Sequence, residues 1–161
     1  MELRLARPDD AEAIRAIYNA EVVDSTVTFD MVPRTVEQQQ AWMSEHAGAY
    51  AAIVAVEGDE VIGFASLAPY RPRPAYATTV EDSVYVRRDR RGKGYGRALL
   101  SELVAVATRH GFHAIIARIL DRHEASIRLH RDCGFELVGT EREVGRKFGK
   151  WLDVVVMQRL L

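Results

Sequence analysis

The sequence has little of three things: cysteine, long apolar stretches and net charge. Cys133 is the only cysteine in 161 residues, which excludes an internal disulfide and a cysteine-rich zinc site. No apolar stretch approaches the length of a membrane span, and Met1–Asp10 lacks the apolar core of a signal peptide. We therefore expect a soluble, cytoplasmic protein without a membrane partner.

The near absence of net charge limits the kind of partner. Lys and Arg total 22 against 23 Asp and Glu, so the formal net charge is -1 and argues against a nucleic-acid-binding protein. The average conceals one basic cluster, in which only Asp89 opposes six cations: Arg87, Arg88, Arg90, Arg91, Lys93 and Arg97. This distribution still allows a local site for one small phosphorylated ligand. The chain length suits a single domain, residues 1–161.

Periodicity and turn signals predict a mixed succession of strands and helices. We expect strands over residues 3–5, 51–56, 61–67, 78–86, 114–120, 135–141 and 152–160, and helices over 10–22, 35–43, 96–110 and 124–133. Asp9 with Glu12, and Thr35 with Gln38, have the spacing of capping boxes at the starts of the first two helices. The Gly58–Asp59 pair is a hairpin-turn signal. The pattern indicates a mixed sheet flanked by helices.

A glycine-rich segment, Arg91–Gly96, joins the strand predicted over 78–86 to the helix that follows it. The first N–H groups of a helix are unpaired, the helix dipole adds partial positive charge, and glycine lets a ligand approach the backbone. The segment therefore predicts a phosphate cradle. It lacks the Lys-Ser/Thr pair of a P-loop and the glycine spacing of a dinucleotide fingerprint. The alternative is a capped surface helix with a solvated basic start.

Two motifs resemble those of one enzyme superfamily. The spacing Arg91-x-x-Gly94-x-Gly96 is similar to the acetyl-CoA pyrophosphate loop of the GCN5-related N-acetyltransferase (GNAT) superfamily. Residues 123–135 resemble the family segment Asn-x-x-Ala/Ser-x-x-Leu-Tyr-x-x-x-Gly-Phe. Two positions depart from this pattern, because His123 replaces the Asn and His130 replaces the Tyr.

Three further strings narrow the resemblance to one branch. Thr28–Asp30 with Pro33 and Thr35, residues 79–86 and residues 143–153 look like the phosphinothricin/methionine sulfoximine N-acetyltransferases, in which His is usual at the position of His130. The resemblance covers nearly the whole chain. It implies a GNAT-like α/β (α+β) fold with a mixed, mostly antiparallel sheet flanked by helices and a CoA-binding strand–glycine loop–helix. It also implies a homodimer.

The resemblance implies that acetyl-CoA is the co-substrate and that a small amino-acid-like primary amine attacks its thioester directly in a ternary complex. Residues expected to bind acetyl-CoA are Val84, Tyr85, Val86, Arg91, Gly92, Lys93, Gly94, Tyr95, Gly96, His123 and Ser126. Two alternatives stay open. One is acetylation of protein N-termini, polyamines or aminoglycosides, and the other is a non-catalytic CoA-binding module.

Two titratable residues are candidates for proton transfer. An ammonium group must lose a proton before it can attack, and Glu81, in an apolar strand, suits the base because apolar surroundings raise a carboxyl pKa. The leaving thiolate needs a proton, and His130 suits that role near neutral pH. The N–H groups of Val84 or Val86 would stabilise an oxyanion. The alternatives are a solvent-facing Glu81 on an edge strand, and a His130 that packs against the sheet or positions substrate.

A second group of residues is expected to bind the substrate. The guanidinium groups of Arg71 and Arg73 match a carboxylate, phosphinate or sulfone, unless they only form a solvated basic loop. The other predicted substrate residues are Phe29, Ala75 and Tyr76, which would shape the pocket wall, and Lys147 and Trp151, which would complete a site from the neighbouring subunit. No cluster has metal-ligand spacing, so we expect no metal site.

Overall fold

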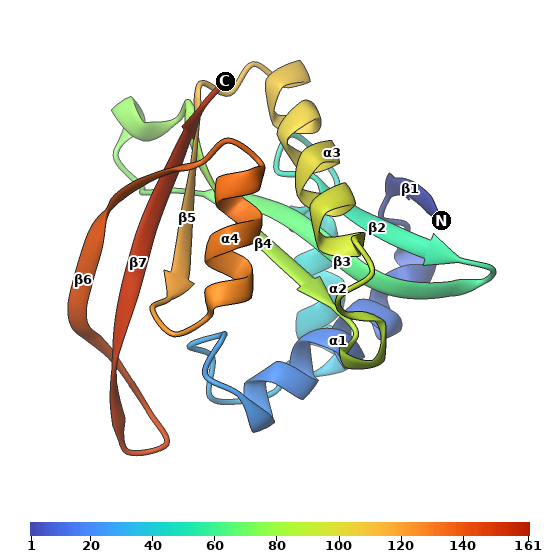
Figure 1. Ribbon diagram of the computed structural model, residues 1–161. Coiled ribbons are helices and arrows are strands. Elements are labelled where there is room, and N and C mark those ends of the chain that lie inside the picture. The colour runs from blue at the N-terminus through green and yellow to red at the C-terminus, as the bar shows by residue number, and fades with distance from the viewer.

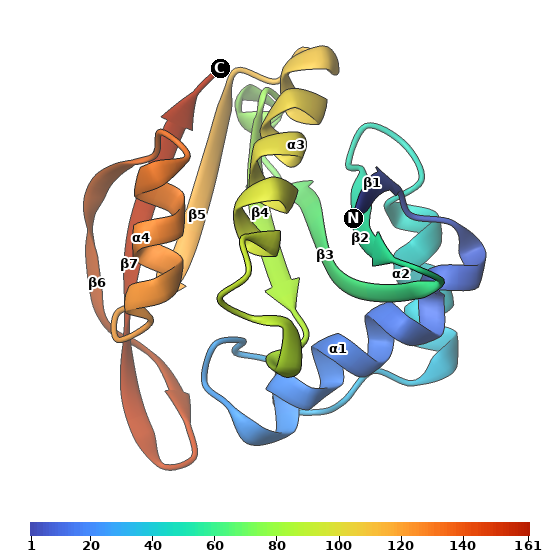
Figure 2. The same cartoon turned by 45° about the vertical axis from the view of Figure 1, so that its right-hand side comes forward.

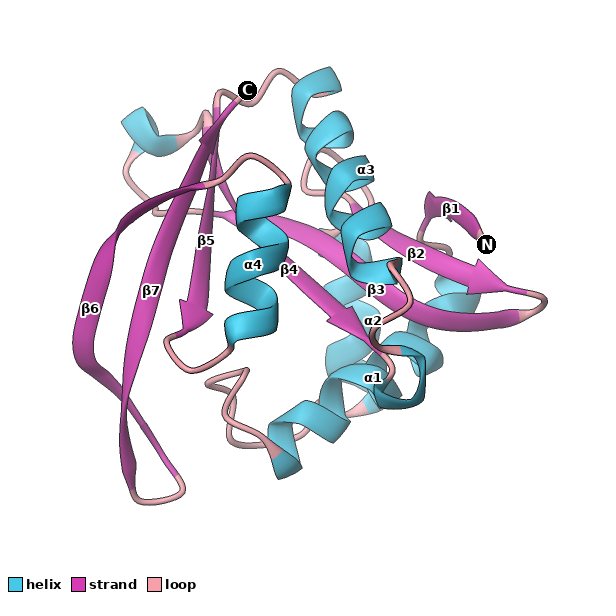
Figure 3. Ribbon diagram, viewed as in Figure 1, coloured by secondary structure: helices cyan, strands magenta, loops and turns pink.

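The computed structural model describes residues 1–161 and is built on one seven-stranded sheet (Figures 1 and 3). The strands are β1 (Glu2–Leu5), β2 (Ala52–Glu57), β3 (Glu60–Pro69), β4 (Thr79–Val86), β5 (Ala114–Leu120), β6 (Glu136–Lys147) and β7 (Lys150–Leu160). Their order across the sheet is β1-β2-β3-β4-β5-β7-β6, and only the β4–β5 pair is parallel. The mixed, mostly antiparallel sheet is thus confirmed.

Helices cover both faces of this sheet (Figure 2). They are α1 (Ala11–Asp24), α2 (Val36–Glu45), α3 (Tyr95–Arg109) and α4 (Glu124–Asp132). Successive strand residues point to opposite faces, and β2 accordingly contributes Val54 to the apolar cluster under α1 but Ile53 and Ala55 to the cluster under α3. The sheet therefore separates two cores, with α3 over the larger one.

The two predicted capping boxes have different outcomes. At α2 the box is present, because the Gln38 N–H donates to the Thr35 hydroxyl and the Thr35 N–H donates to the Gln38 side-chain oxygen. At α1 the prediction is wrong. Residues Pro8–Asp10 form a 3-10 turn, and the Asp10 carboxylate accepts bonds from the Arg7 N–H and the Arg4 guanidinium, so Asp9 caps nothing.

The β6–β7 hairpin is longer than the sequence indicated. The strand predicted to end at Glu141 continues to Lys147, and β7 begins at Lys150 instead of Leu152. The bend is sharp because Phe148 and Gly149 both have positive φ, at 51° and 72°. A register shift between Glu141 and Gly145 interrupts the alternation of side chains between the two faces of the sheet. A search for period-two alternation therefore does not detect this part of the strand.

The parallel pair of strands is the feature that positions the site. β4 and β5 are paired only from Thr79 with Ala114 to Glu81 with Ile116, and beyond that point they diverge. From Asp82 to Val86 the edge of β4 that faces β5 therefore has no strand partner, while its other edge remains paired with β3. No helix of the protein is both long and apolar enough to cross a membrane.

Candidate active site

A cavity of about 230 Å³ occupies the gap between the diverging strands. Its walls come from the last residues of β4 and β5, from the loop before α3, and from α4. The predicted site residues that line it are Val84, Tyr85, Val86, Arg91, Gly92, Gly94, Tyr95, Gly96, His123, Ser126 and His130. The exposed Lys93 does not line it. Elements far apart in sequence thus form one cleft.

The glycine loop presents open backbone at this cleft. Gly92 and Gly94 have φ of 76° and 85°, and a Cβ on either would meet nothing within 4 Å. Gly94 is the N-cap of α3, and no side chain accepts a hydrogen bond from the first turn, which also contains no acidic residue. The first N–H groups of α3 are therefore free for an anion at the positive end of the helix dipole.

The basic cluster beside this loop is less cationic than the sequence suggested. Arg87 pairs with Glu60 and Asp89, and Arg90 pairs with Glu57, whose carboxylate comes from the β2–β3 hairpin. Apart from Asp89, the opposing acids are close in space but distant in the chain, which is why a local count misses them. Lys93 and Arg97 make no salt bridge and remain as the free cations. Arg91 lines the cleft and reaches back to Glu21.

His130 forms a buried pair with an acid that the sequence analysis missed. Its Nε2 lies 2.9 Å from an oxygen of Asp82, and its Nδ1 lies 2.7 Å from the Ser126 carbonyl oxygen. Both partners accept hydrogen bonds, so the geometry places a proton on each ring nitrogen. Burial lowers the pKa of His130, but the Asp82 charge and both hydrogen bonds outweigh it and raise that pKa. The sequence did contain a signal for Asp82: it is an acidic residue on the same strand face as the apolar Val80 and Val84, where a buried side chain is expected.

Glu81 lies at the point where the two strands part. It points to the sheet face opposite that of Asp82, because side chains alternate along a strand, and it is half-buried without lining the cavity. Burial, together with the charges of Asp82 and Glu141, raises the pKa of Glu81, and Arg118 only partly offsets this. The raised pKa agrees with the electrostatics expected of a base.

Two predicted substrate residues belong to one contact between distant segments. Lys147 is 2% exposed, and its ammonium group donates to the Thr28 carbonyl oxygen at 2.9 Å within the same chain. Burial lowers the pKa of Lys147, with partial compensation from Asp30 and Glu21. The ring of Phe29 lies against Gly145, where a Cβ would be 2.3 Å from it. Lys147 therefore has a partner within its own chain, and its expected contribution to a site in a neighbouring subunit stays a prediction.

The other predicted substrate residues lie outside the cleft. Arg71, Arg73, Ala75 and Tyr76 belong to the exposed β3–β4 connection, at the end of β4 opposite the glycine loop (Figure 1). The Arg71 guanidinium lies over the rings of Tyr70 and Tyr76, at 4.9 and 5.8 Å. Trp151 is 60% exposed on β7 with Arg146 over its ring. One chain does not bring these residues together with the cavity.

The contact between Phe29 and Gly145 leads to a prediction about stability. We expect Gly145→Ala to lower the free energy of unfolding by about 1–3 kcal/mol, because the new methyl group overlaps the Phe29 ring. The matched control is Gly139→Ala on the same strand, where a Cβ would meet nothing within 4 Å. Urea unfolding of both variants measures the difference. Equal midpoints would mean that the Phe29 contact does not form in solution.

The Asp82–His130 pair leads to a prediction about pH. Asp82→Asn should lower stability by about 3 kcal/mol, because it leaves a buried imidazolium unpaired. The pKa of His130 is higher in the folded protein than in the unfolded chain, where it is about 6.5. Protonated His130 therefore stabilises the fold fully below pH ~6.5, and this stabilisation is lost as the pH rises through the folded-state pKa. The deficit should therefore be largest below pH ~6.5 and shrink at higher pH. Urea titrations at several pH values test this. The control is Asp132→Asn, an exposed residue on α4, the helix that carries His130. A pH-independent deficit would contradict it.

Comparison with known proteins agrees with this geometry. An L-methionine sulfoximine/L-methionine sulfone acetyltransferase from Pseudomonas paraeruginosa is 42% identical, over 97% of this chain and 92% of that protein. A phosphinothricin acetyltransferase from Sinorhizobium meliloti, solved with AcCoA, is 41% identical with a TM-score of 0.95, over 99% of this chain and 88% of that one. A ribosomal-protein-alanine N-acetyltransferase from Brucella melitensis is 38% identical with a TM-score of 0.98, over 100% of both chains.

The diverging parallel strands, the glycine loop and these relatives define the class of the protein, which is an N-acetyltransferase. A more specific statement follows from the family comparison. The acetyltransferase (GNAT) domain model matches residues 3–156, and the chain belongs to that family. The resemblance inferred from Arg91–Gly96 and residues 123–135 is thereby confirmed.

Proposed function

We propose that the protein transfers the acetyl group of acetyl-CoA to the primary amine of a small amino-acid-like substrate of the phosphinothricin, methionine sulfoximine or methionine sulfone type. The observation that carries this proposal is the cleft between β4 and β5, closed at one end by a glycine loop with free N–H groups. The substrate class is supported by relatives of about the same length with those activities in their names.

The residues of the cleft fit acetyl-CoA, which when bound supplies the activated acetyl thioester. The free N–H groups at the start of α3 and the guanidinium of Arg91 suit a pyrophosphate. The unpaired edge of β4 over Val84–Val86 suits the amides of a pantetheine arm, as in strand addition. Burial and the charge of Arg91 lower the pKa of His123, so its neutral ring offers one donor and one acceptor in place of the usual Asn.

Glu81 and His130 have distinct proposed roles. Glu81 takes a proton from the substrate ammonium, directly or through water, since its raised pKa makes it a stronger base than an exposed carboxylate. His130 already donates both ring protons to Asp82 and Ser126. To protonate the leaving thiolate it has to release one of these bonds, and otherwise it holds Asp82 and the cleft wall in place.

The contact between Lys147 and Thr28 supports binding of an acidic substrate. Lys147 is a buried cation whose only hydrogen-bond partner is a backbone carbonyl, and no carboxylate lies within salt-bridge distance. A substrate carboxylate would neutralise this charge. Phe29, which follows Thr28 in the chain, is the proposed wall of this subsite. Arg71, Arg73, Ala75, Tyr76 and Trp151 remain proposed substrate residues that require a second copy of the chain.

We propose a homodimer, formed in the cytoplasm, as the state that completes the site. Edge strand β6 and its partner β7 expose apolar side chains over one continuous hairpin, which suits a partner surface: Leu137, Val138, Val144, Phe148 and Trp151. The one cysteine, Cys133, is buried and unpaired, in keeping with a reducing compartment. Sedimentation of the purified protein decides its oligomeric state.

A thiol-release assay with acetyl-CoA tests the proposed function. We expect the largest kcat/KM with phosphinothricin, methionine sulfoximine or methionine sulfone. A peptide with an N-terminal alanine is the critical competitor, because one close structural relative is a ribosomal-protein-alanine N-acetyltransferase. A higher kcat/KM for the peptide than for every amino-acid analogue would replace the small-molecule assignment with that second function. CoA binding without turnover of any amine would indicate a non-catalytic module.

A further inference from the structure

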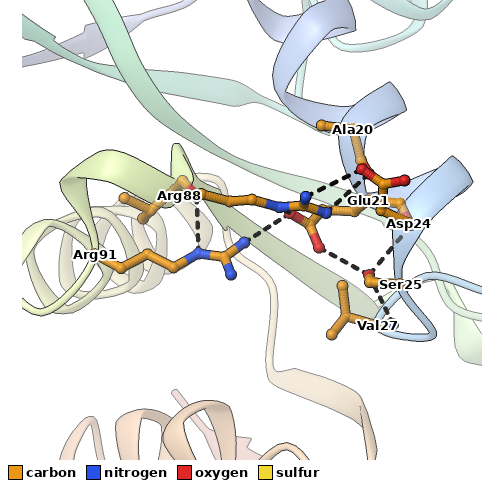
Figure 4. A network of polar contacts seen from close by, with 8 residues as sticks. Ala20, Glu21, Asp24, Ser25, Val27, Arg88 and Arg91 are labelled. Carbon is orange, nitrogen blue, oxygen red and sulfur yellow. Dashed lines mark hydrogen bonds and ion pairs between the residues drawn. The ribbon is translucent and has the colours of Figure 1, made fainter.

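Glu21 is a buried carboxylate on α1 that faces the loop leading to α3 (Figure 4). It is 3% exposed, and its two oxygens have separate partners. Oε1 accepts from Arg88 Nε at 2.9 Å and from an Arg91 Nη at 2.7 Å, while Oε2 accepts from the Ser25 hydroxyl at 2.8 Å. The Ser25 bond fixes the rotation of the carboxyl group, so Oε1 stays directed at the two arginines.

The carboxylate is held in its charged form. Burial raises the pKa of Glu21, but the hydrogen bonds from Arg88 and Ser25 and the charge of Arg91 outweigh it and lower that pKa. A buried anion is stable only when it is paired and fully hydrogen-bonded, and Glu21 meets both conditions. The fold thus maintains a fixed negative charge behind a loop that is expected to bind an anion.

The effect of Glu21 on the cleft passes through Arg91. The Arg91 Nε donates to the Val86 carbonyl oxygen at 3.2 Å and one Nη donates to Glu21, so two of the five guanidinium N–H donors are used. The side chain is half exposed and lines the cavity, which leaves the other donors for a ligand. An arginine whose rotamer is already fixed loses less conformational entropy when it binds.

We propose that Glu21 is a positioning residue, which orients Arg91 for the pyrophosphate of the CoA ligand without touching that ligand itself. This inference rests on the proposed function, since it requires CoA to occupy the cleft. It assigns to α1, a helix outside both family motifs, a share in cofactor affinity. Arg88, bound to the same oxygen, anchors the loop backbone but does not line the cavity.

The test is calorimetric binding of CoA to Glu21→Gln, which keeps the size of the side chain and removes its charge. We expect the Kd for CoA to rise about tenfold. The kcat/KM with S-acetylpantetheine, which lacks the pyrophosphate, should stay within about twofold of the wild-type value. The matched control is Asp24→Asn, because Asp24 binds Arg88 at 3.1 Å but not Arg91, and its Kd for CoA should be unchanged.

A double-mutant cycle separates positioning from a general loss of structure. In an Arg91→Ala background, Glu21→Gln should have no further effect on the Kd for CoA, because the residue through which it acts is gone. If Glu21→Gln does not fold, Glu21→Asp, which keeps the charge on a shorter side chain, takes its place in the cycle. An unchanged Kd in the folded variant, or the same loss with and without Arg91, would overturn the inference. Failure of the wild-type protein to bind CoA would instead overturn the proposed function.

Discussion

Replacing Gly94 with aspartate should abolish measurable binding of acetyl-CoA while the protein still folds. Gly94 is the N-cap of α3 and has open space where a Cβ would stand, so the new side chain meets no neighbouring atom, although the φ of 85° imposes backbone strain on any L residue. Aspartate also tolerates this backbone region better than most residues. Its carboxylate, however, would face the pyrophosphate. A like charge about 4 Å away costs about 4 kcal/mol at an effective dielectric of about 20, or close to a thousandfold in Kd.

The matched variant is Gly94→Asn, which has nearly the same shape and backbone preference but no charge. We expect it to bind CoA within about tenfold of the wild type. Calorimetric titration with CoA measures both variants, and thermal unfolding checks that both are folded. Equal losses in the two variants would attribute the effect to backbone geometry. Retained affinity in Gly94→Asp would refute the assignment of the loop as a phosphate cradle.

Replacing Glu81 with glutamine should lower kcat about a hundredfold or more, because the amide cannot accept the proton of the substrate ammonium. Binding of CoA should be unaffected, since Glu81 does not line the cavity. In the wild-type enzyme a base works only when deprotonated, so kcat should fall as pH drops through the raised pKa of Glu81. Glu81→Gln should lose this fall in kcat at low pH, the acidic limb of the pH–rate profile. Steady-state rates across a range of pH measure both effects.

Glu141→Gln provides the matched control for the base assignment. The negative charge of Glu141 helps to raise the pKa of Glu81. Glu141 also pairs with Arg118, whose positive charge lowers the pKa of Glu81. Removing the charge of Glu141 therefore removes a repulsion and leaves Arg118 unpaired, and both changes favour the ionised form of Glu81. The acidic limb should therefore move to lower pH while kcat at its plateau stays the same. An acidic limb that persists in Glu81→Gln would remove Glu81 from the role of base.

Much of the fold follows from short-range patterns. The glycine loop before α3, the Thr35–Gln38 capping box and the apolar strands β2 and β5 all depend on neighbours within a few residues, and the structure confirms each. The exceptions share one cause. Asp10 and the last third of β6 are shaped by their pairing with Arg4 and with β7, and neither capping-box spacing nor period-two alternation detects such pairing.

The site was less accessible from sequence than the fold. Many of the predicted residues that line the cleft follow one another along β4 and the glycine loop, which is why sequence patterns could point to them. Asp82 and Glu21 were not, because each acts through a side chain more than forty positions away, His130 or Arg91. The predicted substrate residues are distributed between the contact of Phe29 and Lys147 with each other's segments, the β3–β4 connection and β7. Motif resemblance nominates these residues, but it does not say how they are arranged relative to the cleft.

The bond between Lys147 and the Thr28 carbonyl joins residues 119 positions apart. Contacts of such long sequence separation carry a high loop-closure entropy and are expected to form late in folding. The segment around Phe29 can then become ordered only after the C-terminal hairpin has docked on the rest of the sheet. Local opening of that hairpin would release the same segment without unfolding α3 or the glycine loop. The proposed substrate subsite at Phe29 and Lys147 would thus be more sensitive than the proposed cofactor cleft to partial unfolding from the C-terminal side.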